Sequence, residues 1–248
     1  MRRRFLLLPL ALAIGGCGAS AQRPASRAQT VPPSTTPAPA PTTTAKPSAP
    51  KPPPPAPKPK PKPKPSPKPQ PDPGSLPQTH QLPSADSPAF QDEMKALWAG
   101  VQTNSLARAR AAFFPQGAYV QLKAIGDAAG DYSGRLLGDY RLDLGAAHAL
   151  LGPDPASARL IAVHVPQGYA HWVDPGVCYN RAGYYEVPNA RVVYRQNGTV
   201  RSFGIASMIS WRGVWYVIHL GAILRQTAGG VVDDPSPGSG QSAPSSTC

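Results

Sequence analysis

The chain has 248 residues, 34 of them proline, and carries 25 Lys and Arg against 13 Asp and Glu. Its charged content of 15% excludes a long charged coiled coil and an acidic disordered regulator. The longest apolar run, near residues 5–14, is shorter than the roughly 20 residues that a spanning helix needs, which excludes a polytopic membrane protein.

Most of the net positive charge lies outside the part of the chain that can fold. Residues 18–87 hold 23 prolines, nine basic and two acidic residues, so they supply +7 of the net charge of +12. Residues 88–230 hold 13 basic and 9 acidic residues. Since the charge does not belong to one folded face, we expect no nucleic-acid partner.

The first 17 residues have the layout of a secretion signal. Arg2, Arg3 and Arg4 precede a short apolar stretch that ends Ile14-Gly-Gly-Cys17. This ending resembles the bacterial lipobox, which implies cleavage before Cys17, a diacylglycerol on its thiol and a lipid-anchored protein on the outer side of the cell membrane. Ordinary signal cleavage near residues 19–21 is the alternative.

Residues 18–87 are predicted to be a disordered linker. They run through Pro/Thr/Ala repeats into the Lys-Pro repeat of residues 58–65. Proline removes backbone donors and favours extended polyproline II, so the segment is expected to space the domain from the membrane. Its lysines either contact anionic cell-wall polymer or lipid head groups, or simply keep the spacer solvated and extended.

From residue 88 to 230 the composition is that of one globular domain. Ser87 and Pro88 provide a helix start. The spacing of the apolar residues that follow predicts one buried helix face, formed by Phe90, Met94, Leu97, Trp98 and Val101. Further helices are predicted over residues 105–114 and 135–151, because Pro115 and Gly152-Pro153 end them.

The last third predicts an antiparallel sheet. A strand over residues 158–165 precedes a hairpin with Asn197-Gly198 at its turn, and Arg212-Gly213 gives a second two-residue turn. With these turns, Val192 faces Phe203 and Ile209 faces Tyr216, which makes that side of the sheet the core. The same strand alternation places His219 on the opposite face, which carries both polar and apolar residues.

Helices followed by antiparallel strands predict an α+β domain, with N-terminal helices packed on a curved sheet. The order resembles the cone-shaped NTF2-like (nuclear transport factor 2-like) fold. The resemblance is carried by the opening helices with Ala112-Phe-Phe-Pro115 and by the closing strand at residues 213–217. That family includes isomerases, dehydratases and non-catalytic modules. In an enzyme of this kind, His219 and a nearby carboxylate would form the acid–base pair.

Cys178 and Cys248 are predicted to form a disulfide once Cys17 is lipidated, because the protein leaves the reducing cytosol. The bridge would pin the tail, residues 231–248, which is otherwise expected to be flexible. Unpaired thiols or pairing between molecules are the alternatives.

The chain has no common catalytic motif, and we expect no cofactor. His164, His171 and Asp174 fit no standard metal spacing, so no metal is expected either. The segment of residues 166–188 is rich in aromatic and charged side chains, which favours a binding surface for envelope sugar or peptide, unless the rings only cover the sheet. The candidate binding residues are Trp172, Tyr179, Arg181, Tyr184, Tyr185 and His219. We therefore expect a non-catalytic binding or accessory module, with an NTF2-like enzyme as the alternative.

Overall fold

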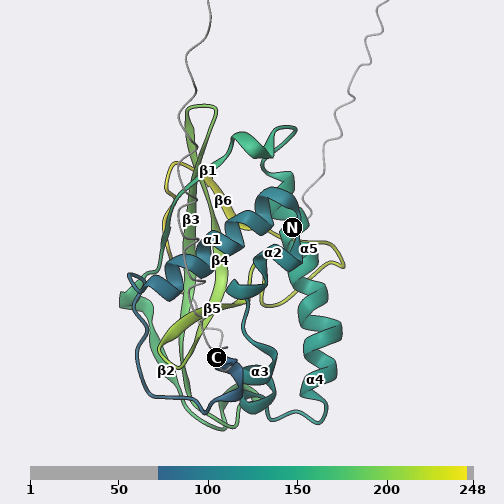
Figure 1. Cartoon of the computed structure of the whole chain (residues 1–248), viewed down its shortest axis with the longest axis vertical. Helices are drawn as coiled ribbons and strands as arrows, with labels where there is room; N and C mark the ends of the chain where they lie inside the picture. The colour runs from purple at the N-terminus through teal and green to yellow at the C-terminus, as the bar shows by residue number, and fades with distance from the viewer. Residues whose placement is uncertain (1–71, 245–248) are drawn as a thin grey trace, which may run out of the picture. The chain divides into compact units, whose positions relative to one another are not determined.

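The computed structural model describes residues 72–244 (Figure 1). The predictions that concern Cys17, the Lys-Pro repeat and Cys248 lie outside these residues. The described helices are α1 (Pro88–Thr103), α2 (Leu106–Ala109), α3 (Gln116–Leu122), α4 (Ala128–Asp131) and α5 (Leu137–Ala149). The strands are β1 (Arg159–His164), β2 (His171–Val173), β3 (Tyr184–Gln196), β4 (Thr199–Trp211), β5 (Val214–His219) and β6 (Asp233–Pro237).

Helix α1 begins as the sequence predicts. The Ser87 hydroxyl accepts a hydrogen bond from the Phe90 amide at 3.3 Å, and Pro88 occupies the first helical position. All five residues of the predicted apolar face are buried. The second predicted helix is shorter than expected, because α2 gives way to a 3-10 turn at Arg110–Ala112.

The third predicted helix, over residues 135–151, corresponds to α5, which is slightly shorter at both ends. A π-helical turn, Tyr132–Leu136, joins α4 to α5. Helix α3 had no sequence prediction, and it packs against the N-terminal segment at a very close approach: a side chain on Gly117 would come within 2.9 Å of the Gly74 carbonyl oxygen. Only glycine fits at such a close contact. Because glycine disfavours a helix, its presence made this helix hard to predict from the sequence.

The six strands form one antiparallel sheet in which β3 and β4 are the long central pair. Strands β1 and β2 pair with β3, whereas β5 and β6 pair with β4. The predicted partners Val192 with Phe203 and Ile209 with Tyr216 are confirmed. Both turns have positive φ at their two central residues, as type I′ turns require: Asn197 and Gly198, then Arg212 and Gly213.

A β-bulge between β4 and β5 overturns the predicted side for His219. Met208 pairs with Val217, but Ser207 pairs with His219, so the register shifts by one residue. A shift by one residue moves a side chain to the other face of a strand. His219 therefore lies on the same face as Ser207, towards the interior, and not on the opposite face.

That opposite face is also buried, which the sequence did not predict. Arg191 is 2% exposed and Trp215 0% exposed. The tail covers part of this face, because β6 pairs with β4 and the Arg191 guanidinium bonds Asp234 at 2.9 Å. The expected flexible tail is thus wrong for residues 231–244, where a buried arginine and strand pairing provide the order that apolar content does not.

The folded part also begins earlier than residue 88. Pro73 accepts a hydrogen bond from the Trp211 indole at 2.9 Å, and the Gln78 side chain donates to the Ser210 carbonyl at 2.8 Å. The folded part therefore includes residues 72–87 of the predicted linker, because residues of this segment form hydrogen bonds with β4.

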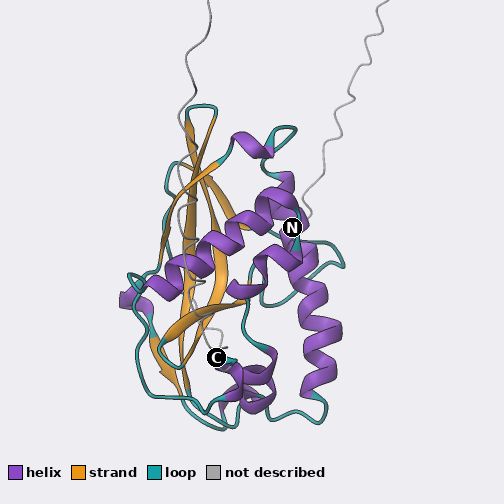
Figure 2. Cartoon of the chain, in the orientation of Figure 1, coloured by secondary structure: helices purple, strands orange, loops and turns teal. Residues whose placement is uncertain are grey.

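Helices and strands share one hydrophobic core, so the fold is α+β (Figure 2). The Phe113 ring stacks on Tyr140 with centroids 3.8 Å apart, and the Tyr140 hydroxyl donates to the Val217 carbonyl at 2.8 Å. The Phe114 amide donates to that same carbonyl at 3.0 Å. Within residues 72–244, no helix combines the length and apolar character needed to cross a membrane.

Candidate functional site

A small polar cavity lies on the interior face of the sheet, next to the end of α3. Its volume is about 60 Å³. We call its charged and hydroxyl-bearing lining residues the interior polar cluster: Lys123 after α3, Tyr184 and Glu186 on β3, Ser207 on β4 and His219 at the end of β5. Apolar residues such as Leu122 and Ile209 complete the wall.

Strand register brings the cluster together. Glu186 pairs with Ile209 and His171 pairs with Glu186, so these side chains share one face. The bulge at Ser207 adds His219 to that face. Bulges commonly re-aim a side chain beside a functional site, and this one turns an imidazole into the cavity.

Glu186 is the carboxylate at the centre of the cluster. It is 2% exposed, and its Oε1 accepts a hydrogen bond from the Ser207 hydroxyl at 2.7 Å. The Nε2 atom of His171 lies 3.8 Å from Oε2. Burial and the nearby Glu186 charge raise the pKa of Tyr184 to about 12, so this phenol stays protonated at neutral pH.

His219 is held in its neutral form. Burial, followed by the positive charges of Arg135, Lys123 and Arg225, lowers its pKa to about 4. Burial and Arg135 also lower the pKa of Lys123. A neutral imidazole can accept a proton as a general base does, but the positive charges around His219 oppose its protonation. The cavity volume, however, leaves room for about two water molecules at ~30 Å³ each, and for no organic substrate.

The loop of residues 174–183 is tied to the end of α3 beside this cavity. The Ala124 amide donates to the Tyr179 carbonyl at 2.6 Å, and the Arg181 amide donates to the Leu122 carbonyl at 2.7 Å. Lys123 donates to the Cys178 carbonyl at 3.4 Å. Cys178 is disulfide-bonded. Its partner lies outside the described residues, so pairing with Cys248 stays a prediction.

A second group of side chains forms the aromatic surface cluster: His80, Trp172 and Tyr185. Trp172 pairs with Tyr185 across β2 and β3, with ring centroids 5.0 Å apart. His80 comes from the N-terminal segment, and its ring lies 3.8 Å from that of Trp172 and 5.3 Å from that of Tyr185. Three separate chain segments thus present rings at one exposed place.

The structure divides the predicted binding residues between two faces. Trp172 and Tyr185 meet in the aromatic surface cluster, whereas Tyr184 and His219 line the interior cavity. Tyr179 is 77% exposed on the loop, and Arg181 is exposed on the same loop.

Sequence reasoning missed His80, Lys123 and Ser207 as members of either group. His80 stood in the presumed linker, and the other two join the cavity through α3 and the bulge, which no pattern in the sequence indicated. Glu186 stood in the predicted aromatic segment, and strand alternation after Tyr184 was the signal that could have placed it.

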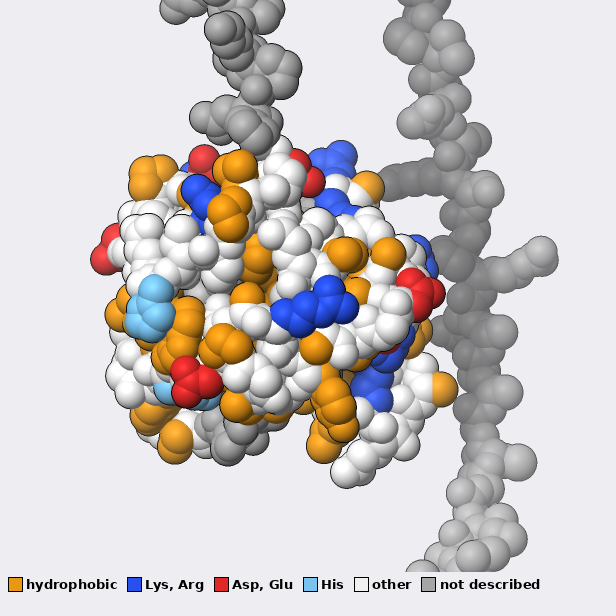
Figure 3. All heavy atoms as spheres, turned by 90° about the horizontal axis from the view of Figure 1, so that it is seen from below, with side chains coloured by type: hydrophobic (Ala, Val, Ile, Leu, Met, Phe, Trp, Pro, Cys, Tyr) orange, Lys and Arg blue, Asp and Glu red, His pale blue; other side chains and the backbone are white. Residues whose placement is uncertain are grey.

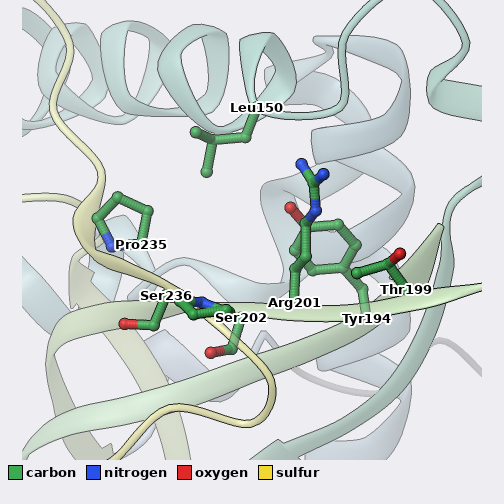
Figure 4. Close-up of a pocket in the computed structure, with 8 residues that line it drawn as sticks. Leu150, Tyr194, Thr199, Arg201, Ser202, Pro235 and Ser236 are labelled. Atoms are coloured by element: carbon green, nitrogen blue, oxygen red, sulfur yellow. The ribbon is translucent and has the colours of Figure 1, made fainter.

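A third feature is a hollow of about 380 Å³ where the tail crosses the long hairpin. Figure 4 shows Arg201 and Tyr194 on one side of it, with Leu150 and Pro235 across from them. The described lining includes no carboxylate. This hollow therefore offers one guanidinium but no acid–base pair.

On the face seen in Figure 3, the Lys and Arg side chains stand in separate groups among acidic and apolar ones. Among residues 72–244, no three His, Cys, Asp or Glu side chains lie close enough together to hold a metal ion.

No protein-family model matches the chain, and neither the curated proteins nor the solved structures that were searched gave a significant match.

Proposed function

We propose that the chain is a cell-surface lipoprotein, anchored in the membrane through Cys17, whose domain is a non-catalytic binding or accessory module of the cell envelope. The helices-first order and the antiparallel sheet support an NTF2-like cone for this domain. The Lys-Pro repeat would space the domain from the membrane and contact anionic wall polymer.

The aromatic surface cluster carries the proposal. Its three rings are exposed or half-buried, and they come from segments far apart in the sequence. Rings with a polar edge bind sugar and peptide at low entropic cost, because each has few rotatable bonds. The interior polar cluster, by contrast, lines a cavity of about 60 Å³, which has room for water but for no organic ligand. Binding at the surface is therefore the function that the geometry supports best.

Cosedimentation of the full chain with insoluble cell-envelope material tests this proposal. We expect Trp172→Ala to reduce the bound fraction severalfold, because Trp172 contacts both other rings. Tyr169→Ala is the matched control, since Tyr169 is 39% exposed and has no ring contact among the described residues. Equal binding by Trp172→Ala and the unchanged chain would overturn the proposed surface.

Acid–base catalysis in an NTF2-like pocket is the second candidate. The convergence of Glu186, Lys123 and neutral His219 in one cavity favours it. Catalysis requires that the cavity open to admit a substrate. Diethyl pyrocarbonate, which acylates accessible neutral imidazoles, gives a test that needs no substrate.

The enzyme reading predicts that His219 is modified about as fast as exposed His164. The binding-module reading predicts that His219 stays protected while His164 reacts. Peptide mass spectrometry after timed exposure separates the two rates.

A further inference from the structure

A pocket between α1 and β5 holds a carboxyl group that belongs to neither the aromatic surface cluster nor the interior polar cluster. Its volume is about 420 Å³, within the range of small-ligand sites. Glu93 of α1 and Tyr216 of β5 contribute its polar wall, and Phe113 is among its apolar lining. Asp72 and Arg110 complete the charged groups of the lining.

Glu93 has a buried carboxyl oxygen without a hydrogen-bond partner among the described residues. Tyr216 lines the same pocket as Glu93, and Glu93 Oε2 is buried with no hydrogen-bond partner within residues 72–244. A buried polar atom left unpaired costs about 1–3 kcal/mol, so it calls for an explanation. A ligand that brings an N–H donor into the pocket would remove this cost.

The charges around Glu93 favour a cationic donor. Asp72 adds a carboxylate to the lining. Arg110, the positive group of the lining, lies with its guanidinium carbon 5.3 Å from the centroid of the Tyr132 ring, which gives its charge a partner outside the pocket. We propose that this pocket binds a primary ammonium group, which donates to Glu93 and packs its alkyl chain against Phe113.

Proton release accompanies such binding. Burial raises the pKa of Glu93 to about 8, an effect that the neighbouring Tyr216 hydroxyl partly offsets. The carboxyl is therefore mainly protonated at pH 7, and a bound ammonium would drive it to the ionised form. Tyr216 stays neutral, because burial raises its pKa further and Glu93 adds to the effect.

Titration of the full chain in an uncharged detergent with n-butylammonium, followed by NMR, tests the proposal. The apparent affinity should rise about tenfold from pH 6 to pH 7 and level off above pH 8, following the ionisation of Glu93. Glu93→Gln should abolish both the binding and its pH dependence. Asp92→Asn is the control, because Asp92 is an exposed carboxylate on the same helix, paired with Lys95.

The ammonium has two possible sources, a free amine or a lysine of this chain. Lys68 precedes Asp72 by four residues, a stretch that spans at most about 14 Å. If Lys68 is the source, Lys68→Gln should raise the affinity for n-butylammonium and raise the pKa of Glu93, followed by carboxyl NMR. If a free amine is the source, Lys68→Gln leaves both unchanged.

Three results would overturn the inference. The first is tighter binding of n-butyrate than of n-butylammonium, with affinity falling above pH 8, which would indicate a carboxylate site. The second is n-butylammonium binding that persists in a folded Glu93→Gln chain. The third is the absence of binding together with no response of Glu93 to Lys68→Gln. Tyr216→Phe provides a second variant if Glu93→Gln does not fold, and it should weaken binding by altering the carboxyl that the ammonium meets.

Discussion

Asp143→Asn tests how the chain holds the end of β5, and with it His219. Asp143 on α5 is 1% exposed. Its Oδ2 accepts from the Gly221 amide at 2.9 Å and from Arg225 at 2.6 Å, and its Oδ1 accepts from the Val231 amide at 2.9 Å. One carboxylate therefore ties the segment after β5 to α5.

The expected loss of stability is large, because the amide removes the charge and presents N–H groups to donors. Removing one partner of a buried ion pair costs about 3–5 kcal/mol. For a domain of this size, about 1 kcal/mol shifts the melting temperature by roughly 2–4 °C. We expect a drop of about 10 °C. Asp92→Asn is the control and should change the melting temperature little, since its carboxylate is 74% exposed in a surface pair.

Two measurements test the role of Asp143. Calorimetry gives the melting temperatures of the variants. Amide hydrogen exchange then shows whether Gly221 and Val231 lose protection first, as the contacts require. A loss of stability below about 1 kcal/mol in Asp143→Asn, or unchanged protection at both amides, would refute the role given to Asp143.

Three further predictions concern the interior cluster, the anchor and the bridge. Because the pKa of His219 is lowered to about 4 in the folded state, its contribution to stability is present above pH ~6.5 and lost as pH falls towards 4, by up to about 3 kcal/mol; the melting temperature of His219→Gln should therefore fall less over this range than that of the unchanged chain. Cys17→Ala should abolish incorporation of labelled fatty acid, and unchanged labelling would contradict the lipobox reading. Non-reducing peptide mapping should link Cys178 to Cys248, whereas linkage to Cys17 would contradict both the bridge and the anchor.

Local patterns in the sequence predicted much of the fold. Ser87 and the apolar spacing after it predicted α1, and Asn197-Gly198 and Arg212-Gly213 predicted the register of the hairpins. These succeeded because capping and type I′ turns depend on residues close in the chain.

The failures share a different cause, since each depends on contacts between distant segments. The tail is ordered by Arg191, which bonds Asp234 43 residues away. The bulge at Ser207 is a feature of the pairing between β4 and β5. The turn residues did not indicate it, so the face on which His219 lies could not be predicted. His80 joined the aromatic surface cluster only because residues 72–87 pack on the sheet, despite a composition that favours a linker.

We have proposed that the domain binds an envelope component at the aromatic surface cluster and not in the interior cavity. NMR of the labelled full chain during titration with solubilised cell-wall fragments tests both places in one experiment. We expect saturable shifts at His80, Trp172 and Tyr185, with the signals of Glu186 and His219 unchanged. Shifts confined to Glu186, Ser207 and His219, with the three surface rings unchanged, would contradict it.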